Sequence, residues 1–181
     1  MIEYRAADPA DAEAIARLHA RSWRESYRGS FTDEFLDGDL PAERLGVWRE
    51  RLVHPDEDRL VQLAVQGTDL VGFVCAYGAH DGEWGSFVDN LHVAGEAKRS
   101  GVGSSLMRQA GAWLDRRHPD LGVYLWVLES NSSARRFYEQ LGARNSEVTT
   151  METHGRAVVR SCRYTWPKAS DLAGVSAKRE P

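Results

Sequence analysis

One stretch of the chain, from about Phe87 to Arg117, limits the possible folds more than any other. It begins with an apolar run to Val93, which predicts a strand, and it ends with a helical periodicity that starts near Val102. The loop between them is rich in small and basic residues. Such a loop directs several backbone N–H groups at one point, where the helix N-terminus adds a partial positive charge. The stretch therefore predicts a strand, an anion-binding site and a helix in succession. A pyrophosphate is the ligand that we expect at this site.

Within this loop the basic pair Lys98 and Arg99 precedes two glycines, which lack the Cβ that would keep an anion from the backbone. Two other phosphate motifs do not fit. A dinucleotide-binding fingerprint requires a third glycine where Leu106 stands, and a P-loop requires a Lys-Ser/Thr pair where Ser104-Ser105 stands. A nicotinamide-dependent oxidoreductase is therefore a weaker interpretation.

The order of the expected elements is that of one mixed α/β domain. The chain predicts a strand, two helices, three strands, a helix, a strand, a helix and two strands, with no internal repeat. We expect a single domain over residues 1–166 and a polar, flexible tail over residues 167–181. The strands are expected at about residues 2–5, 60–65, 71–77, 87–93, 123–128, 148–153 and 157–166.

Composition disfavours several classes of function. The 23 Lys and Arg stand against 27 Asp and Glu, a net charge of −4, which argues against nonspecific nucleic-acid binding. No apolar run approaches the roughly 20 residues of a membrane-spanning helix. The acidic N-terminus is unlike a secretory signal, so we expect a cytoplasmic protein. Cys75 and Cys162 belong to no zinc-binding pattern and are expected to be buried or half-buried thiols, so we expect no metal.

Two sequence motifs occur in an informative order. Residues Lys98 to Gly103 match Gln/Arg-x-x-Gly-x-Gly/Ala, with Lys in place of the usual Gln/Arg. Residues Asn131 to Ala143 match Asn-x-x-Ala-x-x-Phe-Tyr-x-x-x-Gly-Phe, and only the final Ala143 departs. In both motifs, and in the apolar strand between them, the chain resembles the GNAT superfamily of N-acetyltransferases. The resemblance implies the GNAT acyl-CoA N-acyltransferase fold, an α/β (mixed α+β) sheet with splayed central strands and flanking helices.

The resemblance also implies a place for acetyl-CoA as acyl donor. In GNAT proteins the donor lies between the splayed strands, and its pantetheine bonds to the backbone of one of them like an added strand. Leu91 and Val93 match that strand, the glycine-containing loop matches the pyrophosphate cradle, and Asn131 matches a pantetheine ligand. The implied cofactor-binding residues are Leu91, His92, Val93, Lys98, Arg99, Ser100, Gly101, Val102, Gly103, Ser104, Asn131, Ala134, Arg135 and Tyr138.

The implied chemistry needs a proton donor and a proton acceptor. Tyr138 matches the family tyrosine that protonates the departing thiolate, and a phenol with a pKa of about 10 stays protonated at neutral pH. The group that takes a proton from the amine stays open. Asp89, Glu83, His92 and ordered water are all candidates, and Asp89 and His92 join Tyr138 in our catalytic set. Glu129 is either a substrate ligand or a neighbour of a helix cap.

The acceptor is expected to bind at the N-terminal helices, where aromatic and charged residues interleave. Trp23, Glu25 and Tyr27 are the candidate substrate-binding residues. This segment, together with Trp48, resembles the PaiA-like bacterial branch of the superfamily, in which polyamines are acetylated. We expect a small-molecule amine as partner, with a protein N-terminus or lysine as the alternative, and a homodimer would be usual for the family. A noncatalytic acyl-CoA-binding module is the rival function.

Overall fold

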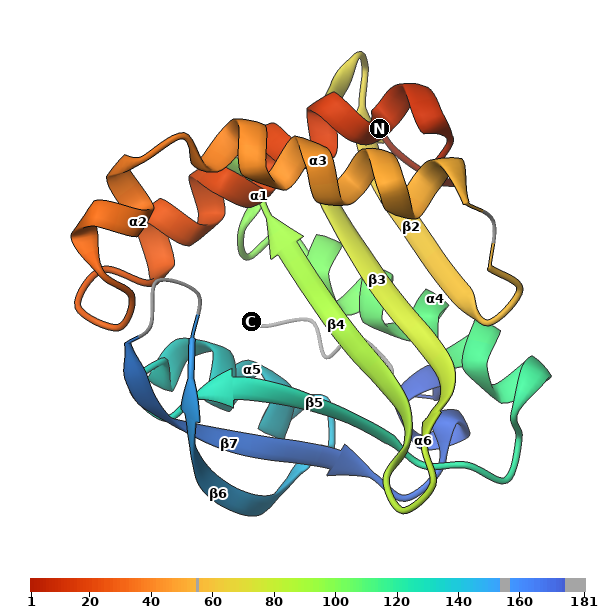
Figure 1. The fold of residues 1–181 in the computed structure, drawn as a ribbon. Coiled ribbons are helices and arrows are strands. Elements are labelled where there is room, and N and C mark those ends of the chain that lie inside the picture. The colour runs from red at the N-terminus through yellow and green to blue at the C-terminus, as the bar shows by residue number, and fades with distance from the viewer. Residues whose placement is uncertain (55, 154–156, 175–181) are drawn as a thin grey trace.

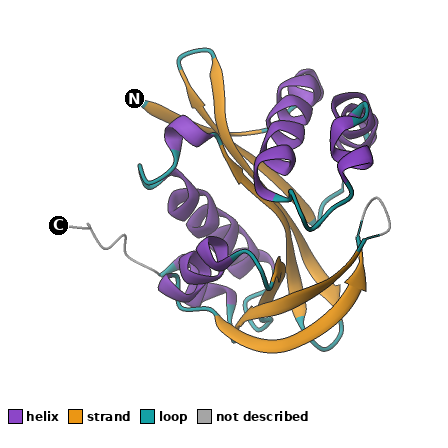
Figure 2. Cartoon of the chain, turned by 90° about the vertical axis from the view of Figure 1, so that its left-hand side faces the viewer, coloured by secondary structure: helices purple, strands orange, loops and turns teal. Residues whose placement is uncertain are grey.

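The computed structural model describes residues 1–54, 56–153 and 157–174. Its strands form one sheet with helices on both faces (Figures 1 and 2). The strands are β1 (Ile2–Ala6), β2 (Arg59–Gln66), β3 (Asp69–Asp81), β4 (Gly85–Val93), β5 (Val123–Leu128), β6 (Arg144–Glu152) and β7 (Val158–Trp166). The helices are α1 (Ala12–Ser26), α2 (Asp33–Asp37), α3 (Leu40–Val53), α4 (Val102–Arg117), α5 (Ser132–Gln140) and α6 (Ala169–Ala173), with 3-10 turns at Pro9–Asp11 and Gly95–Ala97.

The expected mixed α/β fold is confirmed, and the structure adds two short helices. The first is α2, whose N-terminus is capped by Thr32. The second is α6, which lies in the segment expected to be a polar, flexible tail. That expectation fails for residues 169–173, because Leu172 is fully buried and packs where a Cβ on Gly111 would lie. Residues 175–181 of the expected tail are outside the described part of the chain.

The sheet has the strand order β1-β2-β3-β4-β5-β7-β6. Its neighbouring strands are antiparallel except for β4 and β5, which are parallel. The register of this parallel pair covers only Ser86 with Val123 and Phe87 with Tyr124. Beyond Phe87 the two strands diverge, as Figure 1 shows at the arrowheads of β4 and β5. The central strands are therefore splayed, as the family resemblance implies.

A β-bulge lies where β4 and β5 begin to diverge; the opening between their diverging ends is called the splay below. On the other side of β4, Cys75 pairs with Asn90 and Ala76 pairs with Val88, so Asp89 has no partner residue on β3. A bulge adds one residue to a strand and redirects the side chains around it. The extra residue in β4 is thus Asp89, one of the candidates for the base.

The sheet lies between two helical layers, and the hydrophobic core is formed where the helices pack against it. Helices α1 and α3 lie on one face, and α4, α5 and α6 lie on the other, which Figure 2 shows with the sheet between them. The side chains of β3 alternate between these layers: Phe73 contacts Trp48 of α3, while Gly72 leaves room for Leu106 of α4. Successive strand residues place their side chains on opposite faces of the sheet. In β4, this alternation decides which helical layer each side chain contacts beside the splay.

Candidate functional site

The loop before α4 has the backbone of an anion cradle. Arg99 and Gly101 both have positive φ angles, of 65° and 85°. Gly101 is the N-cap of α4, a 16-residue helix, and no side chain caps that end. The first N–H groups of a helix have no partner within it, and the macrodipole makes this end positive. A Cβ on Gly101 would meet nothing within 4 Å, so the approach to these amides is open.

Most of the predicted cradle is exposed, and its last part is packed against the splay. Lys98, Arg99 and Ser100 are exposed, whereas Val102 belongs to the core. A Cβ on Gly103 would lie 3.3 Å from Phe137 Cζ of α5 and 3.6 Å from Val93 Cγ2 of β4. Gly103 therefore sits where α4, α5 and the end of β4 meet, beside the opening between the strands. The residues present would fit a pyrophosphate at the helix N-terminus, next to the opening between the strands.

At the end of β4 the three candidate residues point to two different faces. Leu91 and Val93 are half-buried and pack on the core, on the side where Val93 approaches Gly103 of α4. His92 points to the opposite layer, where its Nδ1 lies 2.8 Å from Ser22 Oγ of α1. Its ring also lies 4.5 Å from the ring of His19. Only 8% of His92 is exposed, so the structure favours a packing role for it over a catalytic one.

Burial makes His92 a source of acid sensitivity. Desolvation, assisted by the positive charges of Lys98 and Arg44, lowers the pKa of His92 to about 3. An unfolded histidine titrates near about 6.5, so below that pH the unfolded chain takes up a proton that the folded chain does not. Above pH ~6.5 His92 therefore does not reduce the free energy of unfolding. Below that pH the free energy of unfolding falls progressively, until the pH reaches about 3.

We expect the free energy of unfolding to fall by about 2 kcal/mol between pH 7 and pH 5 because of His92 alone. The measurement is urea denaturation at both pH values for the wild type and His92→Gln, since glutamine can keep a hydrogen bond to Ser22 but does not titrate in this range. The variant should lose less stability on acidification. Equal losses in the two proteins would show that His92 does not carry this effect.

The N-terminus of α5 lies beside the splay, and two of its motif side chains already form hydrogen bonds within the protein. Asn131 accepts a hydrogen bond from Ala134 N at 3.1 Å through Oδ1, which leaves its Nδ2 group as the donor for a ligand. Arg135 turns away, because its Nη1 donates to Glu129 O at 3.1 Å and its Nε donates to Tyr164 Oη at 3.3 Å. Of the motif residues, Asn131 is thus better placed than Arg135 to touch a ligand.

Tyr138 lies on the inner side of α5. Its half-buried ring packs near Phe137, Tyr164 and Trp166, with centroid distances of 5.2, 6.2 and 6.3 Å. Burial raises the pKa of Tyr138 above its ordinary value, and the nearby Tyr27 phenol adds to the effect. Within the described part of the chain, the Tyr138 hydroxyl makes no hydrogen bond. The phenol is therefore protonated at neutral pH and has a proton to give.

The acidic candidates differ in their surroundings. Asp89, at the bulge, forms an ion pair with Arg51 of α3 at 2.7 Å, and both side chains are about three-quarters buried. Its charge also reaches Tyr27, where it assists burial in raising the pKa of that phenol. Glu129 is held by Arg160 at 2.6 Å on the outer side of β5. Asp89 is thus the acidic group closest to the start of the splay.

Glu83 lies at the wrong end of the sheet. It belongs to the turn before β4, where Asp81 Oδ1 accepts hydrogen bonds from the backbone N–H groups of Glu83 and Trp84. The ten residue steps from Glu83 to Val93 span on the order of 30 Å in extended backbone. Because the strands diverge toward Val93, Glu83 is an unsuitable candidate for the base.

The three residues predicted to bind the acceptor substrate lie in different environments. Trp23 is almost fully buried in a second core with Phe31 and Leu36, and the guanidinium of Arg44 lies 4.5 Å from its ring. Glu25 is exposed, and its carboxylate is 3.9 Å from Lys98 Nζ of the cradle. Only Tyr27 combines partial exposure with a position near Tyr138 and Asp89. The structure therefore favours Tyr27 over Trp23 as a residue that touches a substrate.

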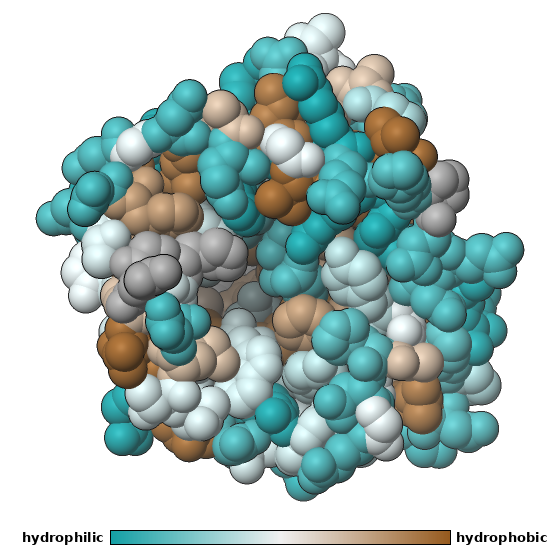
Figure 3. Space-filling view, in the orientation of Figure 1, coloured by the Kyte–Doolittle hydropathy of each residue, from teal (hydrophilic) through white to brown (hydrophobic). Residues whose placement is uncertain are grey.

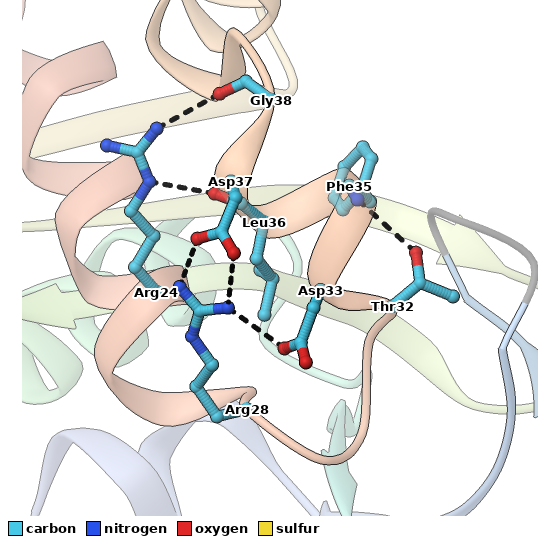
Figure 4. A network of polar contacts seen from close by, with 8 residues as sticks. All are labelled: Arg24, Arg28, Thr32, Asp33, Phe35, Leu36, Asp37 and Gly38. Carbon is cyan, nitrogen blue, oxygen red and sulfur yellow. Dashed lines mark hydrogen bonds and ion pairs between the residues drawn. The ribbon is translucent and has the colours of Figure 1, made fainter.

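A network of arginines fixes the segment that follows α1. Arg24 donates to Leu36 O at 2.8 Å and Gly38 O at 3.1 Å, while Arg28 donates to Asp33 and Asp37 (Figure 4). These contacts fix α2 against the end of α1, and the segment of residues 24–38 forms one edge of the opening, called the lip below. The hollow in the centre of Figure 3 lies below the surface of α1 and α3 and above that of β5 and β7.

This lip reaches across to the other side of the splay. Ser30 Oγ lies 3.3 Å from Ser130 Oγ of the β5–α5 loop, and Leu128 of β5 packs against the second core. Between the two segments is a pocket of about 350 Å³. Its lining is rich in hydroxyl groups and consists of Ser26, Arg28, Gly29, Ser30, Ser130, Asn131, Ser132 and Ser133.

Comparison with known proteins identifies this arrangement. The model of the acetyltransferase (GNAT) family matches residues 20–143. The chain belongs to this family. A probable N-acetyltransferase of Mycobacterium tuberculosis is 31% identical over 145 residues, which cover 77% of this chain and 78% of that protein.

Solved structures agree with the GNAT fold. The PaiA N-acetyltransferase of Thermoplasma acidophilum, in complex with coenzyme A, has a TM-score of 0.67 at 19% identity and covers 89% of this chain and 98% of its own. NAA60 of Arabidopsis thaliana, in complex with acetyl-CoA, has a TM-score of 0.67 at 18% identity and covers 92% and 98%. The expected fold and family are confirmed, while the assignment to the PaiA-like branch stays a prediction.

Some features of this GNAT site were not predicted from the sequence. Arg51 and Ser22, which bind Asp89 and His92, come from helices far away in the sequence. Among the residues that the structure describes, no cluster of three His, Cys, Asp or Glu could hold a metal. None of the helices described is long and apolar enough to cross a membrane. Both cysteines are free and buried, as expected.

Proposed function

We propose that this GNAT protein transfers the acetyl group of acetyl-CoA to the primary amine of a small molecule by direct attack in a ternary complex. The observation that carries the proposal is the uncapped N-terminus of α4 beside the diverging ends of β4 and β5. This arrangement offers backbone amides to a pyrophosphate and unpaired strand edges to a pantetheine. Two structural neighbours were solved with coenzyme A or acetyl-CoA, which supports the same donor here.

When bound, acetyl-CoA supplies an activated acetyl thioester. The loop residues Arg99 to Ser104 hold its pyrophosphate, and the backbone of Leu91 and Val93 orients its pantetheine. Tyr138 donates the proton that the departing thiolate needs, because burial keeps the phenol protonated. Asp89 accepts a proton from the amine, either directly or through a water molecule. Tyr27, near both groups, lines the path by which the amine arrives.

The bridged lips of the opening favour a small acceptor. The contact between Ser30 and Ser130 and the packing of Leu128 under the second core close part of the entrance. A hydroxyl-lined pocket beside Asn131 is suited to the polar part of a compact amine. A protein N-terminus or lysine, the other acceptor class, would need a wider approach to Asp89 and Tyr138.

The first expected result is a large stabilisation by acetyl-CoA. At about 100 times its dissociation constant, a ligand that binds only the folded state stabilises it by about 2.7 kcal/mol, which thermal melting detects easily. Coenzyme A should give a similar shift, because it carries the same pyrophosphate and pantetheine, and NAD should give none. Absence of a shift with acetyl-CoA would contradict the proposal.

Turnover separates the enzyme from its rival, a noncatalytic acyl-CoA-binding module. A panel of spermidine, tyramine, glucosamine, free lysine and a short peptide with a free N-terminus represents the acceptor classes. Release of coenzyme A with one of the small amines supports the proposal. Release with the peptide alone would favour a protein acceptor, and binding without release would favour the module.

A further inference from the structure

The ion pair between Arg51 and Asp89 joins two layers of the molecule at the start of the splay. Arg51 is in the last turn of α3, and Asp89 is the bulged residue of β4. Arg51 Nη1 donates to Asp89 Oδ2 at 2.7 Å, with 25% and 23% of the two side chains exposed. A contact this short and this buried fixes the carboxylate more firmly than a surface ion pair would.

Arg51 is itself held in place. Its guanidinium lies 5.1 Å from the ring of Trp48, which is fully buried, and 5.9 Å from the ring of Tyr77. The backbone carbonyl of Arg51 accepts a hydrogen bond from Arg59 at the start of β2. The cation therefore has little freedom to leave Asp89, and the geometry of the carboxylate follows from the packing of α3.

The contact occupies only one of the two carboxylate oxygens. Within the described residues, Asp89 Oδ1 accepts no hydrogen bond, so it is the oxygen left for a ligand. The charge of Asp89 acts on the Tyr27 phenol, and Tyr27 acts on the Tyr138 phenol, so the three groups belong to one part of the molecule. The free oxygen of Asp89 is thus available to an amine that binds beside Tyr27.

We propose that Arg51 is the positioning residue of the acetyl transfer, holding Asp89 at the bulge so that its free oxygen can accept the proton of the amine. The inference rests on the proposed function. Arg51 touches neither substrate in this assignment and acts only through Asp89. A base misplaced by about 1 Å can cost roughly 100-fold in rate.

The test compares Arg51→Met and Arg51→Lys with the wild type, using the amine of the panel that turns over fastest. Arg51→Met should lower kcat/KM by about 10- to 100-fold, mostly through kcat. Arg51→Lys keeps the charge and should recover much of the loss, although lysine cannot stack as arginine does.

A double-variant cycle shows whether Arg51 acts through Asp89. Asp89→Asn should lower kcat/KM by about 100-fold or more, and adding Arg51→Met should cause little further loss. Additive losses, or a wild-type kcat in Arg51→Met, would overturn the inference. Arg117→Met is the matched control, since Arg117 also lies over a tryptophan, Trp113, and contacts carboxylates, but at the far end of α4. It should leave kcat/KM unchanged.

Two further outcomes separate this inference from the proposed function. If acetyl-CoA stabilises the wild type and coenzyme A is released, but Asp89→Asn is fully active, the acetyltransferase stands and the role of Arg51 falls. If the wild type releases no coenzyme A with any amine of the panel, both fall. The acetyl-CoA melting shift of each variant confirms that it is folded, and Arg51→Lys keeps the test decisive if Arg51→Met does not fold.

Discussion

Replacing Tyr138 by phenylalanine should lower kcat by about 100-fold or more while leaving the affinity for acetyl-CoA nearly unchanged. The ring of Tyr138 packs against Phe137 and lies near Trp166, and phenylalanine preserves these contacts. The hydroxyl makes no hydrogen bond to the described residues, so its removal leaves no partner unsatisfied in the free protein. The loss should therefore appear in the chemical step and not in folding.

The measurement pairs steady-state release of coenzyme A with the melting shift caused by acetyl-CoA. Tyr164→Phe is the control, because it removes a phenol hydroxyl from the same neighbourhood. The Tyr164 hydroxyl donates to Glu139 at 2.5 Å and accepts from Arg135, so its loss should cost about 1–3 kcal/mol of stability. It should leave kcat largely intact. Wild-type turnover in Tyr138→Phe would remove Tyr138 from the mechanism.

The cofactor side of the site could be predicted because its parts are contiguous in the sequence. A strand, a loop with two glycines and a helix N-terminus follow one another, and local backbone geometry alone aims the amides of residues 101–104. The positive φ of Gly101 is a local requirement that the sequence displays directly. The spacing of Asn131 and Tyr138 on one helix is likewise a local property.

The acceptor side could not be predicted, because long-range packing decides it. Strand alternation separates His92 from Leu91 and Val93, but it does not say which face is covered. The contact of His92 with Ser22, 70 residues earlier, settles that question. Asp89 and Arg51 are 38 residues apart on different elements, and no spacing rule connects them. Trp23 and Tyr27, at one helical turn, even differ in burial, because Trp23 lies within the second core while Tyr27 packs on its edge.

Replacing Gly103 by glutamate should abolish the stabilisation by acetyl-CoA, a loss of about 2.7 kcal/mol at 100 times the dissociation constant. A Cβ at this position lies 3.3 Å from Phe137 Cζ, so the side chain must occupy the space where α4, α5 and β4 meet. Its carboxylate would also compete with the pyrophosphate for the positive end of α4. The same charge near a helix N-terminus stabilises the free helix by about 0.3–1 kcal/mol, which partly offsets the crowding.

Because these two effects oppose each other, the melting temperature of the free variant should change much less than the ligand-induced shift. Gln109→Glu provides the comparison, since it adds the same charge to the same helix nearly two turns beyond the loop. This control should keep the full acetyl-CoA shift, which separates a local block of the cradle from a general change in charge. A full shift in Gly103→Glu would mean that the pyrophosphate does not bind at this loop. The donor would then have to bind elsewhere, and Tyr138 and Asp89 would no longer be the expected partners of its thioester and of the amine.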